Sequence, residues 1–251
     1  MYLFFVDGHA IGENEAEVTG PDVKHIKNVL RMKPGDKVRI SDGEKLCYNC
    51  AIKAFREVGE DGGEAVLLRL LERDEDGTEL PAEIVLYQGL PKGDKMELII
   101  QKNVELGIKS IVPVNTKRAV VKLDEKKAEA KRRRWNAISE SAAKQSKRTV
   151  IPEVKAVMDF KAAIDSAEDF DCKLFPYENA EGMEYTRKVL SQVRPGTRTA
   201  VFIGPEGGFD DDEVSYAKEK GFVPITLGRR ILRTETAGFT LLAALMLQLE
   251  K

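Results

Sequence analysis

The chain has 251 residues, 42% of them hydrophobic, and a net charge of −2 at pH 7. This composition excludes a disordered chain, and no apolar run approaches the roughly 18 residues that a membrane-spanning helix needs. The first seven residues lack the basic stretch and the long apolar run of a signal peptide, so we expect a cytoplasmic protein.

Residues 1–72 have the pattern of short β-strands joined by polar turns. Residues 37–41 alternate between polar and apolar side chains, and residues 65–68 form a compact apolar run. A helix is expected over residues 21–30, where apolar side chains recur at helical spacing. Short strands with polar turns between them predict a small β-barrel.

Residues 73–81 are charged and polar and end in a proline, which is typical of a linker. From residue 82 onward, strand patterns alternate with helix patterns, which predicts a mostly parallel sheet with helices on both faces. We expect strands over residues 84–87, 111–114, 200–203 and 223–227, and helices over residues 95–106 and 125–148.

Two later helices carry more specific signals. Asp210 and Glu213 have the spacing of a capping box, so they should begin a helix that Gly221 ends. The last helix should open near residue 234. It is apolar almost all round over residues 241–249, so it must be buried in the core or against another subunit.

The chain has three cysteines, too few for a secreted disulfide framework. Cys47-x-x-Cys50 has the spacing of half a zinc site, but only Cys172, His9 and His25 remain as further soft ligands. A structural zinc site usually takes a second tight ligand pair. We therefore interpret Cys47 and Cys50 as reduced thiols in or beside a strand, and we predict no metal site.

The small net charge hides an uneven distribution. Residues 116–150 contain twelve Lys or Arg and four Asp or Glu, a balance of +8, whereas residues 1–72 have a balance of −3. A basic segment in an otherwise acidic protein favours a surface that faces a polyanion. By charge alone, a solvated helix face is the simpler interpretation.

Three loops near the end of the chain are candidates for a binding site. They are residues 204–209, directly after a strand, residues 227–230, after the next strand, and residues 231–237, which open the last helix. Ligands of open α/β sheets bind beyond the carboxyl ends of strands, where glycines let backbone groups approach closely. The spacing matches neither a Walker A sequence nor the dinucleotide fingerprint. The residues alone therefore leave open a nucleotide-like ligand or a merely tight turn.

Two strings decide between these interpretations by resemblance. Ile203-Gly-Pro-Glu-Gly-Gly-Phe209, followed by Leu227-Gly-Arg-Arg-Ile-Leu-Arg-Thr-Glu-Thr-Ala237, closely resembles the ribosomal RNA small subunit methyltransferase E family, of the knotted SPOUT class. The resemblance spans nearly the whole chain. Further segments that agree in order are Gln88–Met96, Gln101–Gly107, Arg134-Trp135, Gln145–Arg148, and His25–Arg31 with Gly35-Asp36.

The resemblance implies a fold and an activity. It implies a PUA-like barrel in residues 1–72, which helps hold RNA, and a SPOUT α/β domain with a trefoil knot in residues 82–251. It implies a homodimer that uses S-adenosylmethionine to methylate N3 of a uridine in the decoding region of 16S ribosomal RNA. The alternatives are a knotted methyltransferase with another RNA target, and a ribosome-assembly factor that binds RNA without catalysis.

The resemblance also implies which residues hold the cofactor. We expect mainly backbone contacts, with Ile231 and Leu232 as apolar walls, although ordinary core packing would explain these two equally well. The expected cofactor-binding residues are Gly204, Pro205, Glu206, Gly207, Gly208, Leu227, Gly228, Ile231, Leu232, Thr236 and Ala237.

The expected chemistry requires uridine N3 to lose a proton, and the resulting negative charge spreads onto O2 and O4. A cation beside those oxygens would stabilise the transition state. Arg233 is the candidate cation, with a structural or RNA-holding role as the alternative. Glu206 is a candidate base or orienting group, although a carboxylate in that turn could simply accept hydrogen bonds from nearby backbone. Glu235 could be a helix cap.

Contacts to RNA phosphates should come from basic side chains. The candidates are His25, Lys27, Arg31, Arg118, Arg132, Arg133, Lys144, Lys147 and Arg148. Two positions depart from the family pattern: Leu3 stands where the family often has a basic residue, and Ala119 where it often has serine. The first departure removes the basic side chain that would make one N-terminal phosphate contact.

Overall fold

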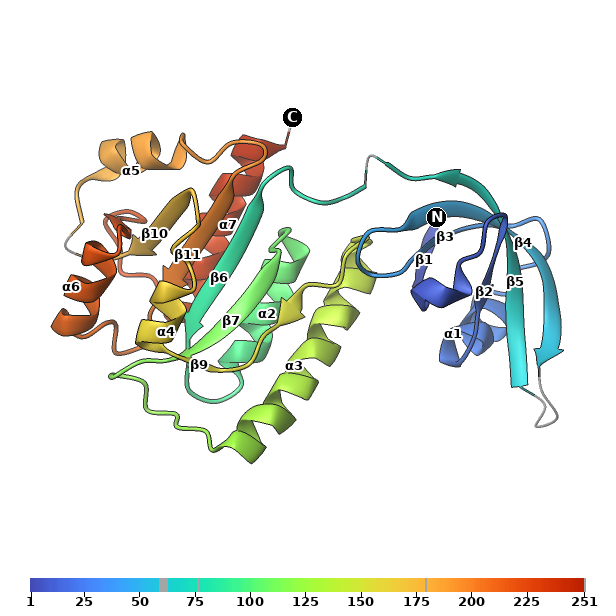
Figure 1. The fold of residues 1–251 in the computed structure, drawn as a ribbon, viewed down its shortest axis with the longest axis horizontal. Helices are drawn as coiled ribbons and strands as arrows, with labels where there is room; N and C mark the ends of the chain where they lie inside the picture. Colours follow the sequence, from blue (N-terminus) through green and yellow to red (C-terminus); the bar gives the residue numbers. More distant parts are fainter. Residues whose placement is uncertain (59–62, 76, 179, 251) are drawn as a thin grey trace. The chain divides into compact units, whose positions relative to one another are not determined.

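The computed structural model describes all residues except 59–62, 76, 179 and 251. The chain divides into two compact units, each of which is visible in Figure 1. The first unit contains Met1–Glu79 together with Ala143–Ile151, and the second contains Leu80–Ala142 and Pro152–Lys251. The first unit therefore includes a segment from the middle of the chain, which overlaps the end of the basic segment, residues 116–150.

A five-stranded sheet in the order β1-β3-β4-β5-β2 forms most of the first unit. The strands β1 and β3 pair in parallel and the other pairs are antiparallel. The strands are β1 (Tyr2–Phe5), β2 (Glu15–Val18), β3 (Lys37–Ser41), β4 (Cys47–Val58) and β5 (Gly63–Arg73). The short helices are η1 (Gly8–Ala10), α1 (Pro21–Lys24) and η2 (His25–Val29), which is a π-helix continuing α1.

The expected strand over residues 37–41 and the expected helix over residues 21–30 are confirmed, but short strands are wrong for β4 and β5. These strands have 12 and 11 residues. Two irregularities in the register of β4 and β5 allow this pair to bend. One long bent hairpin therefore takes the place of several short strands. Cys47 and Cys50 are buried in β4, which confirms their predicted place in a strand. Among the described residues, no three His, Cys, Asp or Glu side chains gather as a metal-binding group.

Residues 143–151 belong to the first unit because of specific hydrogen bonds. The Ser41 hydroxyl donates to the carbonyl oxygen of Thr149 over 2.6 Å, and the backbone N–H of Ile151 donates to Gly43 over 2.9 Å. The buried Arg148 side chain forms an ion pair with Glu79. These partners are far apart in the sequence, so no local pattern indicated the association.

The second unit is built on a parallel sheet in the order β12-β10-β11-β6-β7-β8, with β9 also paired to β7. Every strand pair in it is parallel, which confirms the predicted α/β class. The strands are β6 (Glu83–Gly89), β7 (Ser110–Asn115), β8 (Glu153–Val154), β9 (Met158–Asp159), β10 (Cys172–Pro176), β11 (Arg198–Ile203) and β12 (Val223–Ile225).

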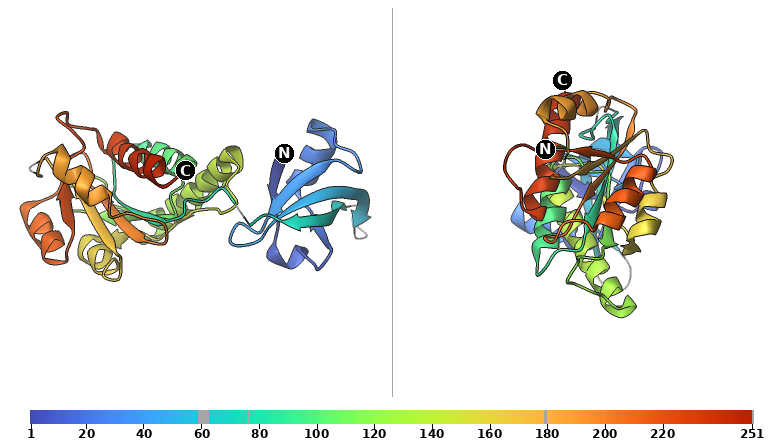
Figure 2. Two further views of the ribbon diagram at one scale, coloured as in Figure 1. Left: turned by 90° about the horizontal axis from the view of Figure 1, so that it is seen from above. Right: turned by 90° about the vertical axis from the view of Figure 1, so that its left-hand side faces the viewer.

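Helices cover both faces of this sheet, as predicted. They are α2 (Lys95–Glu105), α3 (Glu125–Ser146), α4 (Phe160–Asp165), α5 (Met183–Leu190), α6 (Asp211–Glu219) and α7 (Thr234–Leu249). Helices α2 and α7 pack together on one face, whereas α4 and α6 lie on the other (Figures 1 and 2). No described helix meets the length and apolarity that crossing a membrane requires.

The ends of α3 and α7 refine two expectations. Helix α3 stops two residues early because Lys147 adopts a left-handed backbone with φ 60°, which ends a helix. Helix α7 begins at Thr234 as expected and buries Leu241 and Leu245, but Leu247 is 77% exposed. Within this chain, α7 is therefore buried on one face only.

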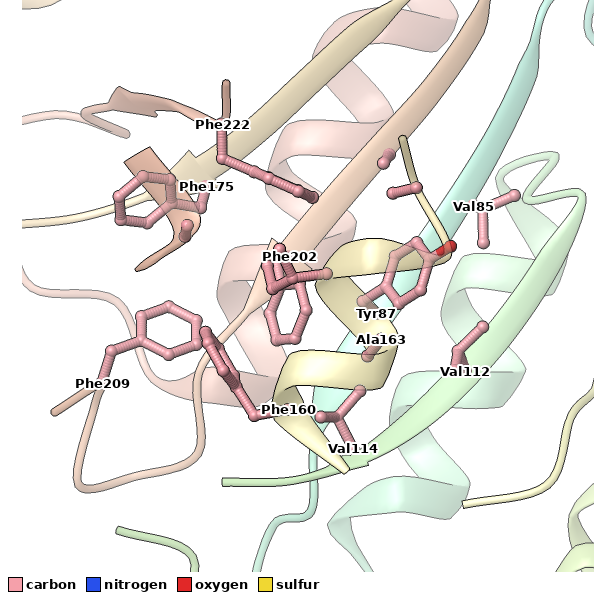
Figure 3. Close-up of a cluster of buried hydrophobic side chains, with 14 of the residues drawn as sticks. Val85, Tyr87, Val112, Val114, Phe160, Ala163, Phe175, Phe202, Phe209 and Phe222 are labelled. Atoms are coloured by element: carbon pink, nitrogen blue, oxygen red, sulfur yellow. The ribbon is translucent and has the colours of Figure 1, made fainter. Parts of the chain in front are cut away.

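An aromatic cluster fixes the loop that follows β11 (Figure 3). The Phe202 ring of β11 stacks on Tyr87 of β6, with the ring centroids 5.5 Å apart. It also contacts Phe160 of α4 at 5.3 Å and Phe209 at 5.6 Å. Aromatic pairs at these separations contribute about 0.5–1.5 kcal/mol each beyond their buried area. Because Phe209 ends the first candidate loop, the core anchors that loop at both ends.

Candidate cofactor site

A cavity of about 820 Å³ lies where the strands of the second unit end. Its lining comes from the segments that follow β6, β7, β10, β11 and β12, so it occupies the carboxyl edge of the parallel sheet. The three predicted loops, residues 204–209, 227–230 and 231–237, all contribute to it. The fold thus brings together three loops, each of which the sequence pattern had indicated only as a separate candidate.

Most of the residues expected to bind a cofactor line this cavity. Thr236, already inside α7, is not among its described lining residues. Ile231 lines the cavity but is 89% exposed, so its side chain lies at the rim and not in a buried wall. The expected cofactor-binding residues in the lining are Gly204, Pro205, Glu206, Gly207, Gly208, Leu227, Gly228, Ile231, Leu232 and Ala237, and the catalytic candidate Arg233 lines the cavity as well.

Close backbone approaches explain two of the glycines around the first loop. A Cβ atom on Gly207 would lie 3.1 Å from the Cβ atom of Arg118. A Cβ atom on Gly89, the last residue of β6, would lie only 2.6 Å from Cδ of Pro205. A side chain at either position would push the loop outward, so these glycines set the position of residues 204–208.

A buried hydrogen-bond chain joins β6, the first loop and α7. The Gln88 side chain donates to the Thr234 hydroxyl over 2.9 Å, and that hydroxyl donates to the carbonyl oxygen of Gly204 over 2.6 Å. Gln88 is fully buried and Thr234 is 6% exposed. The start of α7 is therefore held directly against the first loop, residues 204–209, which is called the glycine loop below.

Replacing Thr234 with valine should destabilise the protein by about 1–3 kcal/mol, because a buried Gln88 donor and the Gly204 carbonyl lose their shared partner. Valine keeps the shape of threonine, so packing changes little. The free energy of unfolding in urea measures the effect. Thr234→Ser retains the hydroxyl and serves as the control. Equal stabilities of Thr234→Val and the unchanged protein would contradict this role.

Charged side chains form a second connection at the cavity. Lys95 Nζ lies 2.9 Å from a Glu206 oxygen and 3.3 Å from a Glu235 oxygen. The backbone N–H of Lys92 donates to both oxygens of Glu206 at 3.2 and 3.3 Å. Burial by itself would raise the pKa of Glu206, but the hydrogen bonds from Lys95 and Lys92 outweigh it and lower that pKa. Glu206 is thus held as a carboxylate.

Glu206 should stabilise the fold above its ordinary pKa of 4.5 and lose that contribution as the pH falls through its lowered value. The reason is that the carboxylate accepts the bonds from Lys95 and Lys92 more strongly than the protonated acid does. Glu206→Gln should therefore be less stable than the unchanged protein near neutral pH, and the difference should shrink in acid. Unfolding in urea from pH 7 to pH 3 (about the range over which a carboxyl titrates) measures it. A difference independent of pH would contradict this assignment.

The capping box predicted for α6 is present. The Asp210 side chain accepts from the backbone of Asp212, and a Glu213 oxygen accepts from the backbone N–H of Asp210 over 2.9 Å. The other Glu213 oxygen accepts from the backbone N–H of Lys117 over 2.8 Å. Lys117 Nζ also lies 3.0 Å from an Asp210 oxygen. The cap therefore fixes the segment after β7, which carries Arg118 to the cavity.

Comparison with known proteins identifies the family. Residues 78–246 match the RNA methyltransferase domain family, and residues 18–54 match the RNA methyltransferase PUA domain. A ribosomal RNA small subunit methyltransferase E of Bacillus subtilis (strain 168) is 36% identical over 93% of this chain and 90% of its own length. The namesake of Mesomycoplasma hyopneumoniae (strain 232) is 33% identical over 96% and 97%.

The chain belongs to the ribosomal RNA small subunit methyltransferase E family. A solved structure of the Neisseria gonorrhoeae member, bound to S-adenosyl methionine, superimposes with a TM-score of 0.80 at 31% identity and covers 99% of this chain and 98% of that chain. A putative methyltransferase of Legionella pneumophila, in complex with the same cofactor, gives a TM-score of 0.78 at 30% identity, over 98% and 97%.

The cavity of this methyltransferase E family member fits such a cofactor. Among the described residues, the backbone N–H and C=O groups of Leu227, Ile231 and Leu232 make no hydrogen bond, so they are available to a ligand. Gly208 and Gly228 have φ of +66° and +117°, and a Cβ atom on either would meet nothing within 4 Å. Open space therefore lies over both glycines, as a cradle for a ligand requires.

Several site residues escaped the sequence analysis. Lys95, Tyr177, Glu178 and Thr226 line the cavity, and Gln88 supports it from behind. Each lining residue follows a strand of the parallel sheet within a few positions. The rule that ligands bind beyond strand ends would have found Tyr177 and Glu178 if β10 had been predicted, but the apolar signal over residues 151–193 was too weak.

The RNA candidates of the N-terminal region lie together in or just after η2. The His25 ring meets Phe4 edge-on with the centroids 6.4 Å apart, and Lys27 forms an ion pair with Glu64. Arg31 adopts a left-handed backbone with φ 53°. The departure noted at the start of the chain, Leu3, is buried in β1.

The candidates of residues 143–151 differ in exposure. Lys144 lies 3.6 Å from Asp22, an ion pair within the first unit. Lys147 is exposed at the turn after α3. Arg148 is 3% exposed and forms an ion pair with Glu79, so its guanidinium holds this segment in place and is not available to a phosphate. Arg148 is therefore not part of an RNA-binding surface.

The candidates of the second unit lie on two segments. Arg118 lines the cavity and lies 3.8 Å from Asp210. Arg132 and Arg133 lie on α3, where both form ion pairs with Glu129. Exposed ion pairs of this kind exchange readily with other anions because they contribute little free energy. The second departure, Ala119, is buried beside Arg118.

Proposed function

We propose that the protein transfers the methyl group of S-adenosylmethionine to N3 of a uridine in the decoding region of 16S ribosomal RNA. The observation that carries this proposal is the convergence of three loops, two of which contain glycine, on one cavity at the carboxyl edge of the sheet. Membership of a family whose member binds S-adenosyl methionine supports it. When bound, the cofactor supplies a methyl group on a sulfonium.

Different residues of the cavity have different roles in this reaction. The unpaired backbone groups of Leu227 and Leu232 bind the cofactor, and the Gln88–Thr234 hydrogen bond keeps their loop against Gly204. Arg233 lines the same cavity and stabilises the negative charge that develops on the uracil oxygens. Glu206 is engaged by Lys95 and Lys92 and has a lowered pKa, which suits an orienting group better than a base.

We further propose the finer features of the fold. The C-terminal segment forms a trefoil knot of the SPOUT class, and the five-stranded sheet of the first unit closes as a PUA-like barrel. The path of the chain supports the knot: after β12 at the sheet edge, it returns past the Gly204 loop and ends in α7 beside α2. We also propose residues 1–72 as the barrel, 73–81 as the linker and 82–251 as the methyltransferase domain.

The protein is proposed to act in the cytoplasm as a homodimer. Helix α7 is largely apolar, and its apolar residue Leu247 is exposed, which supports a partner surface on this helix. Binding of the small ribosomal subunit or its RNA would use the remaining basic candidates, which are His25, Lys27, Arg31, Arg118, Arg132, Arg133, Lys144 and Lys147.

Two measurements test this function. S-adenosylhomocysteine at 100 times its dissociation constant should stabilise the fold by about 2.7 kcal/mol in a thermal unfolding assay. Incubation with S-adenosylmethionine and unmodified 16S RNA should then place one methyl group on a uridine N3, located by mass spectrometry. A stabilised fold with methylation elsewhere would indicate another RNA target. Saturating ligand without a thermal shift would indicate an RNA-binding factor that does not catalyse.

A further inference from the structure

The loop between β12 and α7 places three arginines at the cavity, and none of them has an acidic partner among the described residues. Arg229, Arg230 and Arg233 all line the cavity and all are exposed. Within the described part of the chain, none of their side chains makes an ion pair or a hydrogen bond. Glu178 and Asp211 line the same cavity, yet neither pairs with them. This contrasts with Arg132 and Arg133, which both form an ion pair with Glu129.

Unpaired guanidinium groups at one rim favour an anionic ligand with more than one charged site. A guanidinium presents a planar set of donors that matches a phosphate oxygen pair. Arg233 faces the chemistry in the proposed function, which leaves Arg229 and Arg230 without an assigned role. Arg229 and Arg230 are consecutive exposed residues at a bend of this loop, so they are suited to two neighbouring phosphates, as on an RNA strand that passes the cavity.

An apolar side chain lies among these cations. Ile231 is 89% exposed, the largest exposure recorded for any large hydrophobic side chain in the described residues. Exposed apolar side chains beside base-binding cavities act as wedges, because they replace a stacking partner when a nucleotide leaves its stack. A base must leave its stack before its N3 can reach a methyl donor in a cavity.

We propose that Arg229 and Arg230 bind the phosphates that flank the target nucleotide, and that Ile231 contacts the neighbouring base when the target nucleotide enters the cavity. This assignment rests on the proposed function and names the loop that presents its substrate. A second copy of this chain is a poorer occupant. Around a two-fold axis through the loop, the unpaired arginines of one copy would face those of the other.

The phosphate part is tested by the salt dependence of RNA binding. The probe is an in vitro transcript of 16S RNA, measured by fluorescence anisotropy at several potassium chloride concentrations. Log affinity falls as log salt concentration rises, so the slope is negative. The double variant Arg229→Ala/Arg230→Ala should make this slope shallower by about 0.7–0.9 for each lost contact. The matched control is Arg194→Ala, an exposed arginine before β11, at the amino edge of the sheet away from the cavity. It should leave the slope unchanged.

The wedge part is tested by turnover. Ile231→Ala should lower the single-turnover rate at saturating RNA by at least about tenfold while keeping the salt slope and the affinity for S-adenosylhomocysteine. Ile231→Leu should restore most of the rate.

Three results would overturn the proposal, and each is separable from failure of the proposed function. One is a salt slope of the arginine double variant equal to that of Arg194→Ala. Another is loss of S-adenosylhomocysteine binding in the loop variants, which would make the loop part of the cofactor site. The third is dissociation of Ile231→Ala into monomers in analytical ultracentrifugation, which would place Ile231 in an interface between copies. The proposed function is tested separately, on the unchanged protein. Its thermal shift with S-adenosylhomocysteine and its methylation of uridine do not depend on the loop variants.

Discussion

Arg233→Ala is expected to lower the methylation rate about 100- to 1000-fold, as removal of one preorganised donor to a developing oxyanion does in other enzymes. Its affinity for S-adenosylhomocysteine should be unchanged. The Arg233 side chain lines the cavity, whereas its carbonyl oxygen accepts the first hydrogen bonds of α7, from Thr236 and Ala237. Alanine keeps that backbone role and removes only the guanidinium. Single-turnover rates at saturating RNA, together with calorimetric titration of the cofactor product, measure both quantities.

Arg233→Lys serves as the control for charge. A lysine retains the positive charge but not the planar donor pair, so a rate between those of alanine and arginine is expected. The opposite pattern, in which cofactor affinity collapses while turnover at saturating cofactor stays normal, would show that Arg233 binds the cofactor and does not act on the uracil.

Gly89→Ala is expected to destabilise the protein by about 1–3 kcal/mol, the range for an added methyl group in a filled space, and to weaken cofactor binding at the same time. The new Cβ atom would lie 2.6 Å from Cδ and 2.8 Å from the backbone nitrogen of Pro205. Because the contact includes backbone, the glycine loop itself must move. Urea unfolding and the thermal shift with S-adenosylhomocysteine measure the two effects.

Gly182→Ala is the matched control. Gly182 precedes α5 with φ −64°, and a Cβ atom there would meet nothing within 4 Å. This variant should keep the cofactor affinity of the unchanged protein and lose less stability than Gly89→Ala, because alanine only replaces glycine as the N-cap of α5. If Gly89→Ala behaves in the same way, the close approach of β6 to the glycine loop does not position the site.

The sequence determined the features that depend on neighbouring residues. Asp210 and Glu213 of the capping box lie three positions apart, and both of its hydrogen bonds form as the spacing predicts. The alternation of strands and helices after residue 82 predicted the parallel sheet, and that class of sheet predicted where a ligand would bind. The family strings then identified the loops that line the cavity.

Only the tertiary structure decided which distant groups support those loops. Gln88 meets Thr234 across 146 positions, Lys95 meets Glu206 across 111, and Ser41 meets Thr149 across 108. Local spacing carries no information about such partners, because the order of strands in a sheet, and not their order in the chain, decides which segments lie side by side. For the same reason, the sequence alone indicates only a strand end at Gly89 and a surface cation at Arg148. The structure shows that Pro205 lies against Gly89 and that Arg148 is buried in an ion pair with Glu79.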